Sequence, residues 1–195
     1  MERVSELWKQ GAPIGEIAAA IDALPGAEQV RWSRGLSGRE QARLWQLCEG
    51  RGASLEAIVP PAIAPLRPVI HEGRNSLPLF QLFEKRFCRP TVDSEELWGY
   101  NEGVTRGVVG PGYFVCEATP GDPRGEVVIN YERIPPETIS SWPPLRPNEA
   151  GLSRFVYAGM QDFLRKVTDR ITIGRAWRGG KETGNYFTLC RAEEA

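Results

Sequence analysis

The sequence predicts an α+β fold, in which a mostly antiparallel sheet packs against a long helix (149–168) and a small all-helical module precedes both. Apolar residues recur at helical spacing through the first sixty residues, prolines then crowd a short stretch, and β-rich runs separated by turn residues follow. We therefore expect a helical N-terminal module (1–59), a Pro-rich linker (60–68) and an α+β domain (69–195).

Two helices of the N-terminal module have clear boundaries in the sequence. Between Pro13 and the break at Pro25, apolar residues recur with the period of an amphipathic helix. Ser37 and Glu40 have the spacing of a capping box, which predicts that a further helix begins there. Shorter helices are expected before and after these two.

Short β-rich runs dominate the second part of the chain. The predicted strands cover 69–72, 97–103, 104–109, 113–117, 126–131, 171–177 and 185–191. Gly110 and Gly112 flank Pro111 and predict a hairpin turn between the third and fourth of these runs. The helix at 149–168 is predicted because apolar residues recur at nearly every fourth position from Leu152 to Val167.

The segment Leu77–Phe87 fits either a helix or a strand. As a helix it places Phe80, Phe83 and Phe87 along one face, whereas as a strand it mixes rings with charged side chains on each face. The pattern favours the helix, and the strand stays open as the alternative.

Composition limits the classes of partner. The chain has 195 residues, 41% hydrophobic and 25% charged, with a net charge of −1, so we expect a soluble folded protein and no nucleic-acid partner. No apolar run is long enough to span a membrane, so no membrane partner and a cytoplasmic location are expected. The four cysteines form no CxxC pair and the chain has one histidine, so we expect no metal site. No cofactor motif is complete, and the cofactor stays unknown.

Two residues are candidates for catalysis. His71 is the sole histidine, and it alone changes charge near neutral pH without a shifted pKa. Cys88 has Lys85, Arg86 and Arg89 nearby, and positive neighbours lower the pKa of a thiol and make it more nucleophilic. These two residues carry the alternative that the protein is an enzyme, with His71 as acid or base or Cys88 as nucleophile.

The main expectation is a non-catalytic domain that binds a small ligand or a protein partner between the sheet and the long helix. Glycines among aromatic residues leave room for a ligand, and polar side-chain tips can orient it. The predicted ligand contacts are Tyr100, Asn101, Arg106 and Tyr113, with His71 and Arg74 in addition. A weaker alternative is nucleic-acid binding through the N-terminal helices, because 14–34 superficially resembles a helix-turn-helix, although that segment has few basic residues.

Overall fold

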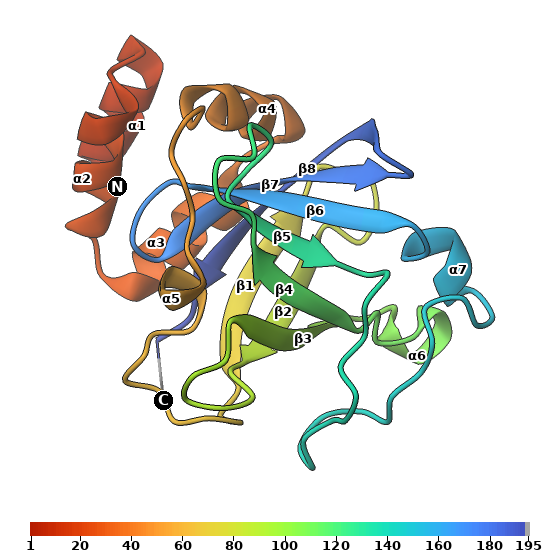
Figure 1. Cartoon of the computed structure of the whole chain (residues 1–195). Helices are drawn as coiled ribbons and strands as arrows, with labels where there is room; N and C mark the ends of the chain where they lie inside the picture. Colours follow the sequence, from red (N-terminus) through yellow and green to blue (C-terminus); the bar gives the residue numbers. More distant parts are fainter. Residues whose placement is uncertain (194–195) are drawn as a thin grey trace.

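A computed structural model describes residues 1–193, and its centre is a closed barrel of eight antiparallel strands (Figure 1). Each strand pairs with the next along the chain, and β8 closes the barrel against β1. The strands are β1 Val69–Asn75, β2 Leu82–Cys88, β3 Glu96–Glu102, β4 Phe114–Ala118, β5 Val127–Asn130, β6 Met160–Lys166, β7 Ile171–Arg178 and β8 Lys181–Arg191. The expected sheet on a long helix is therefore wrong: the strands are antiparallel, but the sheet closes on itself.

Within residues 1–193, seven helices accompany the barrel. They are α1 Glu2–Gln10, α2 Ile14–Asp22, α3 Gly26–Gly35, α4 Gly38–Leu47, α5 Leu55–Ile58, α6 Arg106–Val109 and α7 Ser153–Val156. The capping box is confirmed, because the Ser37 hydroxyl accepts from the backbone of Glu40 and the Glu40 carboxylate accepts from the backbone of Ser37. None of the helices among these residues combines the length and apolarity needed to cross a lipid bilayer.

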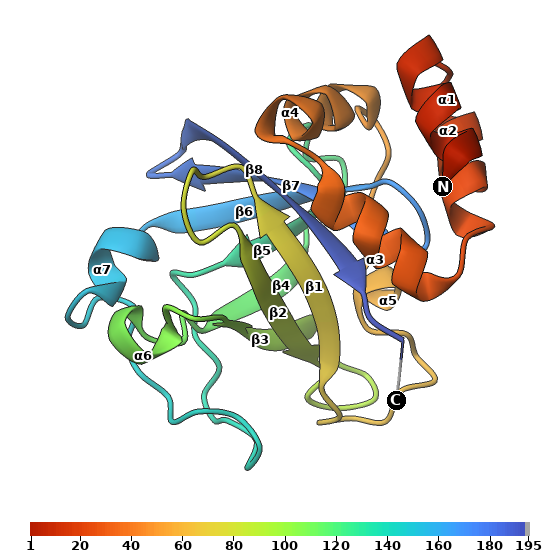
Figure 2. The same cartoon turned by 180° about the vertical axis from the view of Figure 1, so that it is seen from behind.

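The N-terminal helices cover the outer surface of one side of the barrel. Helices α3 and α4 lie across β8, with further contacts to β1 and β7 (Figure 2). Ile17, Leu44 and Trp45 form a buried cluster with outward side chains of the strands, and the ring centroids of Trp45 and Trp177 are 5.8 Å apart. The strands on this side are therefore buried on both faces.

The helix predicted at 149–168 is wrong. The segment forms only the single turn α7, then Gly159 with φ of 69°, and then β6. Four consecutive residues of β6, from Asp162 to Arg165, are buried. The apolar residues from Leu152 to Val167 have helical spacing, but they are divided between α7, β6 and the residue after β6, so this spacing does not arise from one helix.

The helix favoured for 77–87 is also wrong. Residues 82–88 form β2, in which Phe83, Lys85 and Phe87 face the interior while Glu84 and Arg86 face outward. The strand alternative looked poor because it places a lysine between two phenylalanines, and that is the arrangement in the structure. The predicted strand at 104–109 is likewise replaced by α6, and β3 pairs with β4 across it.

The two ends of the barrel differ. The connections β1–β2, β3–β4, β5–β6 and β7–β8 lie at one end, together with α6 and α7 at the right of Figure 1; we call this the open end. The other end is closed by α5 and its flanking residues. Ala53, Leu55, Ile58 and Val59 there join a buried cluster with inward side chains of the strands. Apolar side chains therefore fill the half of the barrel interior next to α5, and the half next to the open end is not filled in this way.

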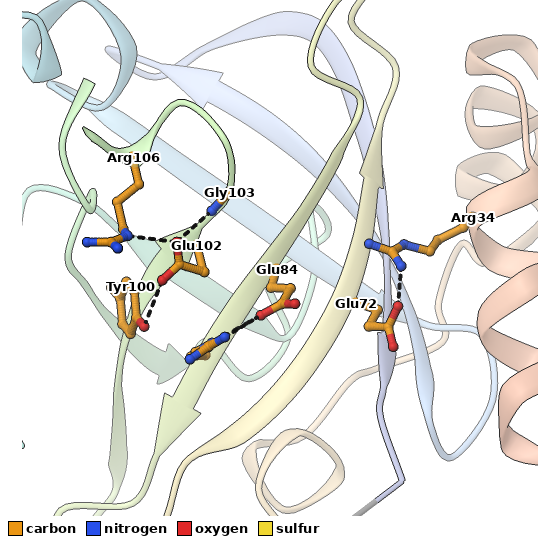
Figure 3. Close-up of polar contacts among 8 residues, drawn as sticks. Arg34, Glu72, Glu84, Tyr100, Glu102, Gly103 and Arg106 are labelled. Atoms are coloured by element: carbon orange, nitrogen blue, oxygen red, sulfur yellow. Dashed lines mark hydrogen bonds and ion pairs between the residues drawn. The ribbon is translucent and has the colours of Figure 1, made fainter. Parts of the chain in front are cut away.

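A row of carboxylates crosses the outer surface of three strands (Figure 3). Glu72 is opposite Glu84, and Glu84 is opposite Glu102. Like charges opposite each other destabilise a sheet, but each carboxylate here pairs with an arginine: Arg34 of α3, Arg86 of β2 and Arg106 of α6, respectively. The Glu102 carboxylate also accepts from the Gly103 amide at 3.0 Å and the Tyr100 hydroxyl at 3.3 Å, which fixes the end of β3 beside the open end.

Candidate functional site

A cavity of about 660 Å³ lies inside the open end of the barrel. Its walls are mostly apolar and include Phe83, Phe187, Tyr157 and Met160. Its floor is a polar cluster, which we define as Lys85, Asn101, Tyr131 and Asp162. Below this cluster the interior is packed with apolar side chains, so the cluster marks the boundary between a hollow half and a filled half.

Strand alternation brings the polar cluster together. Lys85 on β2 and Asn101 on β3 are directly opposite each other and both face inward. Asp162 comes from β6 on another part of the wall, and Tyr131 directly follows β5. Because successive side chains on a strand alternate between its two faces, one inward position on each strand is enough to place these groups at the same depth.

The lysine is held by three oxygen atoms. Lys85 Nζ donates to Asn101 Oδ1 at 2.8 Å, to the Tyr131 hydroxyl, and to Asp162 Oδ2 at 3.3 Å. The side chains of Lys85 and Asp162 are 3% and 7% exposed, so this is a buried ion pair. The Asn101 amide in turn donates to the Gly112 carbonyl at 3.0 Å and to the Tyr131 hydroxyl at 3.2 Å, which holds the loop after β3 against the cluster.

Burial and the ion pair act in opposite directions on the charges of the cluster. Burial lowers the pKa of Lys85, and the neighbouring Asp162 opposes that shift. Burial raises the pKa of Asp162, and Lys85 opposes that shift. Aromatic rings also surround the ammonium, whose Nζ lies 5.0 Å from the ring centroid of Tyr131 and 5.2 Å from that of Phe187. The ion pair therefore opposes the effect of burial on the pKa of both groups.

Two glycines make room for the aromatic walls. Gly73 on β1 lies under the ring of Phe83, and Gly174 on β7 lies under the ring of Phe187. A Cβ atom at either glycine would overlap the ring, so these positions exclude larger residues. The two rings meet edge to face with centroids 6.1 Å apart and form one continuous wall.

The rim of the cavity is apolar and exposed. Leu79 and Phe80 in the β1–β2 connection, Val104 before α6 and Phe155 in α7 are 69%, 64%, 83% and 62% exposed. Large apolar side chains gathered from three separate connections around an opening are typical of a surface that meets a ligand or partner. Arg178 at the end of β7 donates to the carbonyls of Phe155 and Val156 at 3.0 and 2.7 Å, and so holds α7 beside the opening.

The predicted ligand contacts divide into two groups. Asn101 and Arg106 line the cavity. Tyr100 and Tyr113 lie on the outer face of the barrel. Both pack against Trp142, which belongs to the connection between β5 and α7, and the ring centroid of Trp142 is 5.1 Å from that of Tyr100 and 6.3 Å from that of Tyr113. The structure therefore brings Asn101 and Arg106 to one site and places the two tyrosines elsewhere.

His71 and Arg74 also lie outside the cavity. His71 faces the filled half, where its Nε2 is 2.9 Å from the Ile58 carbonyl, and burial lowers its pKa to about 4. Arg74 donates to the Arg34 carbonyl at 2.7 Å and to Gln81 at 2.8 Å, so it links β1 to α3 and to the β1–β2 connection.

Cys88 does not line the cavity either. It is buried on the outer side of β2 beside Trp98 and Tyr100, and burial raises the pKa of its thiol to about 12, which disfavours the thiolate. All four cysteines are free and buried. Within the described residues, no group of three or more His, Cys, Asp or Glu side chains is placed to hold a metal ion.

Sequence reasoning missed three of the four floor residues: Lys85, Tyr131 and Asp162. Lys85 had a local signal, since a charged residue midway between Phe83 and Phe87 must share their face if the segment is a strand. Asp162 had none, because it fell within the predicted helix at 149–168. Its partner lies 77 positions away in the sequence.

Comparisons with known proteins do not place this chain in a family. No protein-family model, curated protein or solved structure matches the chain. The role of the cavity has therefore to be argued from the side chains that form it.

Proposed function

We propose that this protein binds one small, largely apolar molecule in the cavity at the open end of the barrel. The observation that carries the proposal is the cavity itself: about 660 Å³, with mostly apolar walls and a few polar groups that converge on its floor. Ligand sites in proteins typically have this size and this composition. An eight-stranded barrel has an interior that side chains can fill or that can hold one small ligand, and here one half is left unfilled.

The walls support binding by burial of apolar surface. The side chains of Phe83, Tyr157 and Met160 border the cavity and are partly exposed, and they would be removed from water when an apolar molecule enters. Each square ångström of apolar surface buried in this way contributes about 25 cal/mol. The exposed side chains of the rim extend the apolar surface to the opening, where a ligand enters.

Binding also fits the positions of the two catalytic candidates better than catalysis does. His71 and Cys88 both lie outside the cavity, and burial disfavours the charged form of each. Neither is placed to touch a molecule bound in the cavity against Phe83 and Phe187. The proposal is therefore a carrier or sensor of a small molecule rather than an enzyme built on these two residues.

A retained ligand and a designed block of the cavity test the proposal. Native mass spectrometry of the freshly purified protein should detect a bound small molecule, and the neutral apolar fluorophore Nile red should bind with one-to-one stoichiometry. Ala176 lines the cavity opposite Asp162 on β7, so Ala176→Leu should fill part of the space and weaken Nile red binding by about tenfold.

Ala118→Leu provides the matched control. Ala118 is exposed at the end of β4 towards the closed end, so the same added atoms should leave Nile red binding unchanged. Thermal unfolding of both variants separates lost binding from lost folding. Absence of Nile red binding by the folded wild-type protein, or equal binding by the Ala176→Leu variant, would refute the proposal.

A further inference from the structure

The floor of the cavity carries balanced charges. Lys85 and Asp162 form one buried ion pair, and the other two members of the polar cluster, Asn101 and Tyr131, are neutral at ordinary pH. Burial raises the pKa of Tyr131 well above its ordinary range, so its hydroxyl keeps its proton. A ligand group that carries a net charge would leave one charge without a partner in a site that water barely reaches, and such a charge is costly.

The donors of the cluster are already used. An ammonium has three N–H groups, and those of Lys85 meet Asn101, Tyr131 and Asp162. The two N–H groups of the Asn101 amide meet Gly112 and Tyr131. A ligand that offers only an acceptor, such as a ketone or an ether oxygen, must therefore displace an existing hydrogen bond to be recognised.

Acceptor capacity remains on Asp162. A carboxylate has about four lone-pair sites, whereas Asp162 accepts from Lys85 at 3.3 Å, a long contact for a charged pair. The Tyr131 hydroxyl also interacts with Asp162, but it donates its one proton to Asn101 Oδ1 at 3.2 Å. Asp162 lines the cavity although its side chain is only 7% exposed. A donor that enters from the cavity side would supply a hydrogen bond that the folded chain leaves incomplete.

We infer that the ligand is an apolar molecule with a neutral hydroxyl group, bound with the hydroxyl inward as a donor to Asp162 and with its apolar body against the wall formed by Phe83 and Phe187. This inference rests on the proposed function and adds the chemical class of the ligand. A ligand carboxylate would lie beside the negative charge of Asp162. A ligand ammonium would lie beside the positive charge of Lys85. The alcohol adds no charge and uses the free acceptor.

The reverse orientation is unfavourable for the same reasons. An alkyl end pressed against the floor would cover Asp162 without donating to it, and the lone pairs of the carboxylate that face the cavity would lose water without gaining a donor. At the rim, by contrast, Leu79, Val104 and Phe155 are apolar and suit the far end of the molecule. The polarity of the cavity therefore runs from a polar floor to an apolar opening.

Three ligands of equal chain length test the inference: decanol, decanoate and decyl methyl ether, each measured by displacement of Nile red from the wild-type protein at pH 7. Decanol should bind at least about tenfold more tightly than either of the others, as expected for one hydrogen bond to a charged group. Equal affinities, or tighter binding of decanoate, would overturn the inference and leave the proposed function intact. Failure of all three to displace bound Nile red would also overturn it.

Variants of the floor should change the preference in opposite directions. Asp162→Asn leaves the charge of Lys85 unbalanced, so decanoate should then bind more tightly than decanol. Lys85→Gln leaves the charge of Asp162 unbalanced, so the preference for decanol over decanoate should increase. Asp122→Asn, the matched control in the β4–β5 connection at the closed end, should keep the wild-type preference. A folded Asp162→Asn variant that still prefers decanol would contradict the inference. If neither floor variant folds, the affinities of the three ligands for the wild-type protein decide the question.

Discussion

The two halves of the barrel interior are built by the same strands and differ in what those strands place inside. In the closed half, Phe87, Leu97, Phe114 and Leu164 are fully buried against one another and against α5. In the open half, the small side chain of Ala176 on β7 leaves space beside the aromatic wall, and the polar cluster at the floor separates the two halves.

Alternation alone therefore does not decide whether a barrel interior becomes a core or a site. On β2, three successive inward positions are Phe83 in the wall of the cavity, Lys85 in its floor and Phe87 in the core. One strand thus contributes to all three layers. The size and charge of the inward residue at each depth decide the outcome, which can be tested residue by residue along the same strand.

Phe87 and Phe83 give the largest expected contrast. Phe87→Ala should lower the free energy of unfolding by about 3 to 5 kcal/mol, because it opens a void in a filled core. Phe83→Ala should cost about 1 to 2 kcal/mol, because that ring is only partly buried and already borders open space. Urea unfolding measures both. Equal losses would mean that the open half is packed as tightly as the closed half.

The ion pair at the boundary should show strong coupling. Lys85→Met or Asp162→Leu alone should cost about 3 to 5 kcal/mol, because each leaves one buried charge without its partner. The double variant should lose much less than the sum of the two, because it leaves no charge behind. Additive losses in urea unfolding would show that water reaches the floor and solvates each charge separately.

The closed half and the N-terminal helices were the parts closest to prediction from the sequence. The helix between Pro13 and Pro25 and the capping box at Ser37 are local signals, and both correspond to helices in the structure. Most of the predicted strands also coincide with strands. Closure of the sheet had no such signal, because it depends on the pairing of β1 with β8, more than a hundred residues apart in the sequence.

The open half was the part that was predicted least well from the sequence. The charged residues of 77–87, Lys85 among them, favoured a helix where β2 lies, and the helical spacing of apolar residues from Leu152 to Val167 predicted a helix where β6 lies. In both places a charged residue faces the interior of the barrel, against the usual rule that charges face water. Such exceptions are expected where residues serve a site rather than a core.

His71 makes the closed half sensitive to pH. Its pKa is lowered from 6.5 to about 4 in the folded protein by burial, so the unfolded chain takes up a proton at a higher pH than the folded chain does. The stability that neutral His71 contributes is present above pH 6.5 and is lost as the pH falls towards 4, by about 3 kcal/mol.

The charged groups that act on His71 are Arg191 and Arg170, both of which disfavour its protonation. His71→Gln keeps a donor for the Ile58 carbonyl but cannot titrate, so its free energy of unfolding should depend less steeply on pH between 6.5 and 4. Urea unfolding at several pH values measures this difference directly. Parallel pH profiles for the wild-type protein and the variant would show that the folded protein accepts the proton on His71 without cost.

The rim should give the smallest change in stability and a selective change in binding. Val104 at the open end is 83% exposed and Val92 at the closed end is 74% exposed, so Val→Ser at either position should alter the free energy of unfolding by no more than about 0.5 kcal/mol. Val104 lines the cavity, and its replacement should weaken Nile red binding about two- to threefold through lost apolar contact. Val92→Ser should leave binding unchanged. If fluorescence titration shows the same affinity for both variants, the exposed side chains of the rim take no part in binding, and the apolar site ends at the walls formed by Phe83 and Phe187.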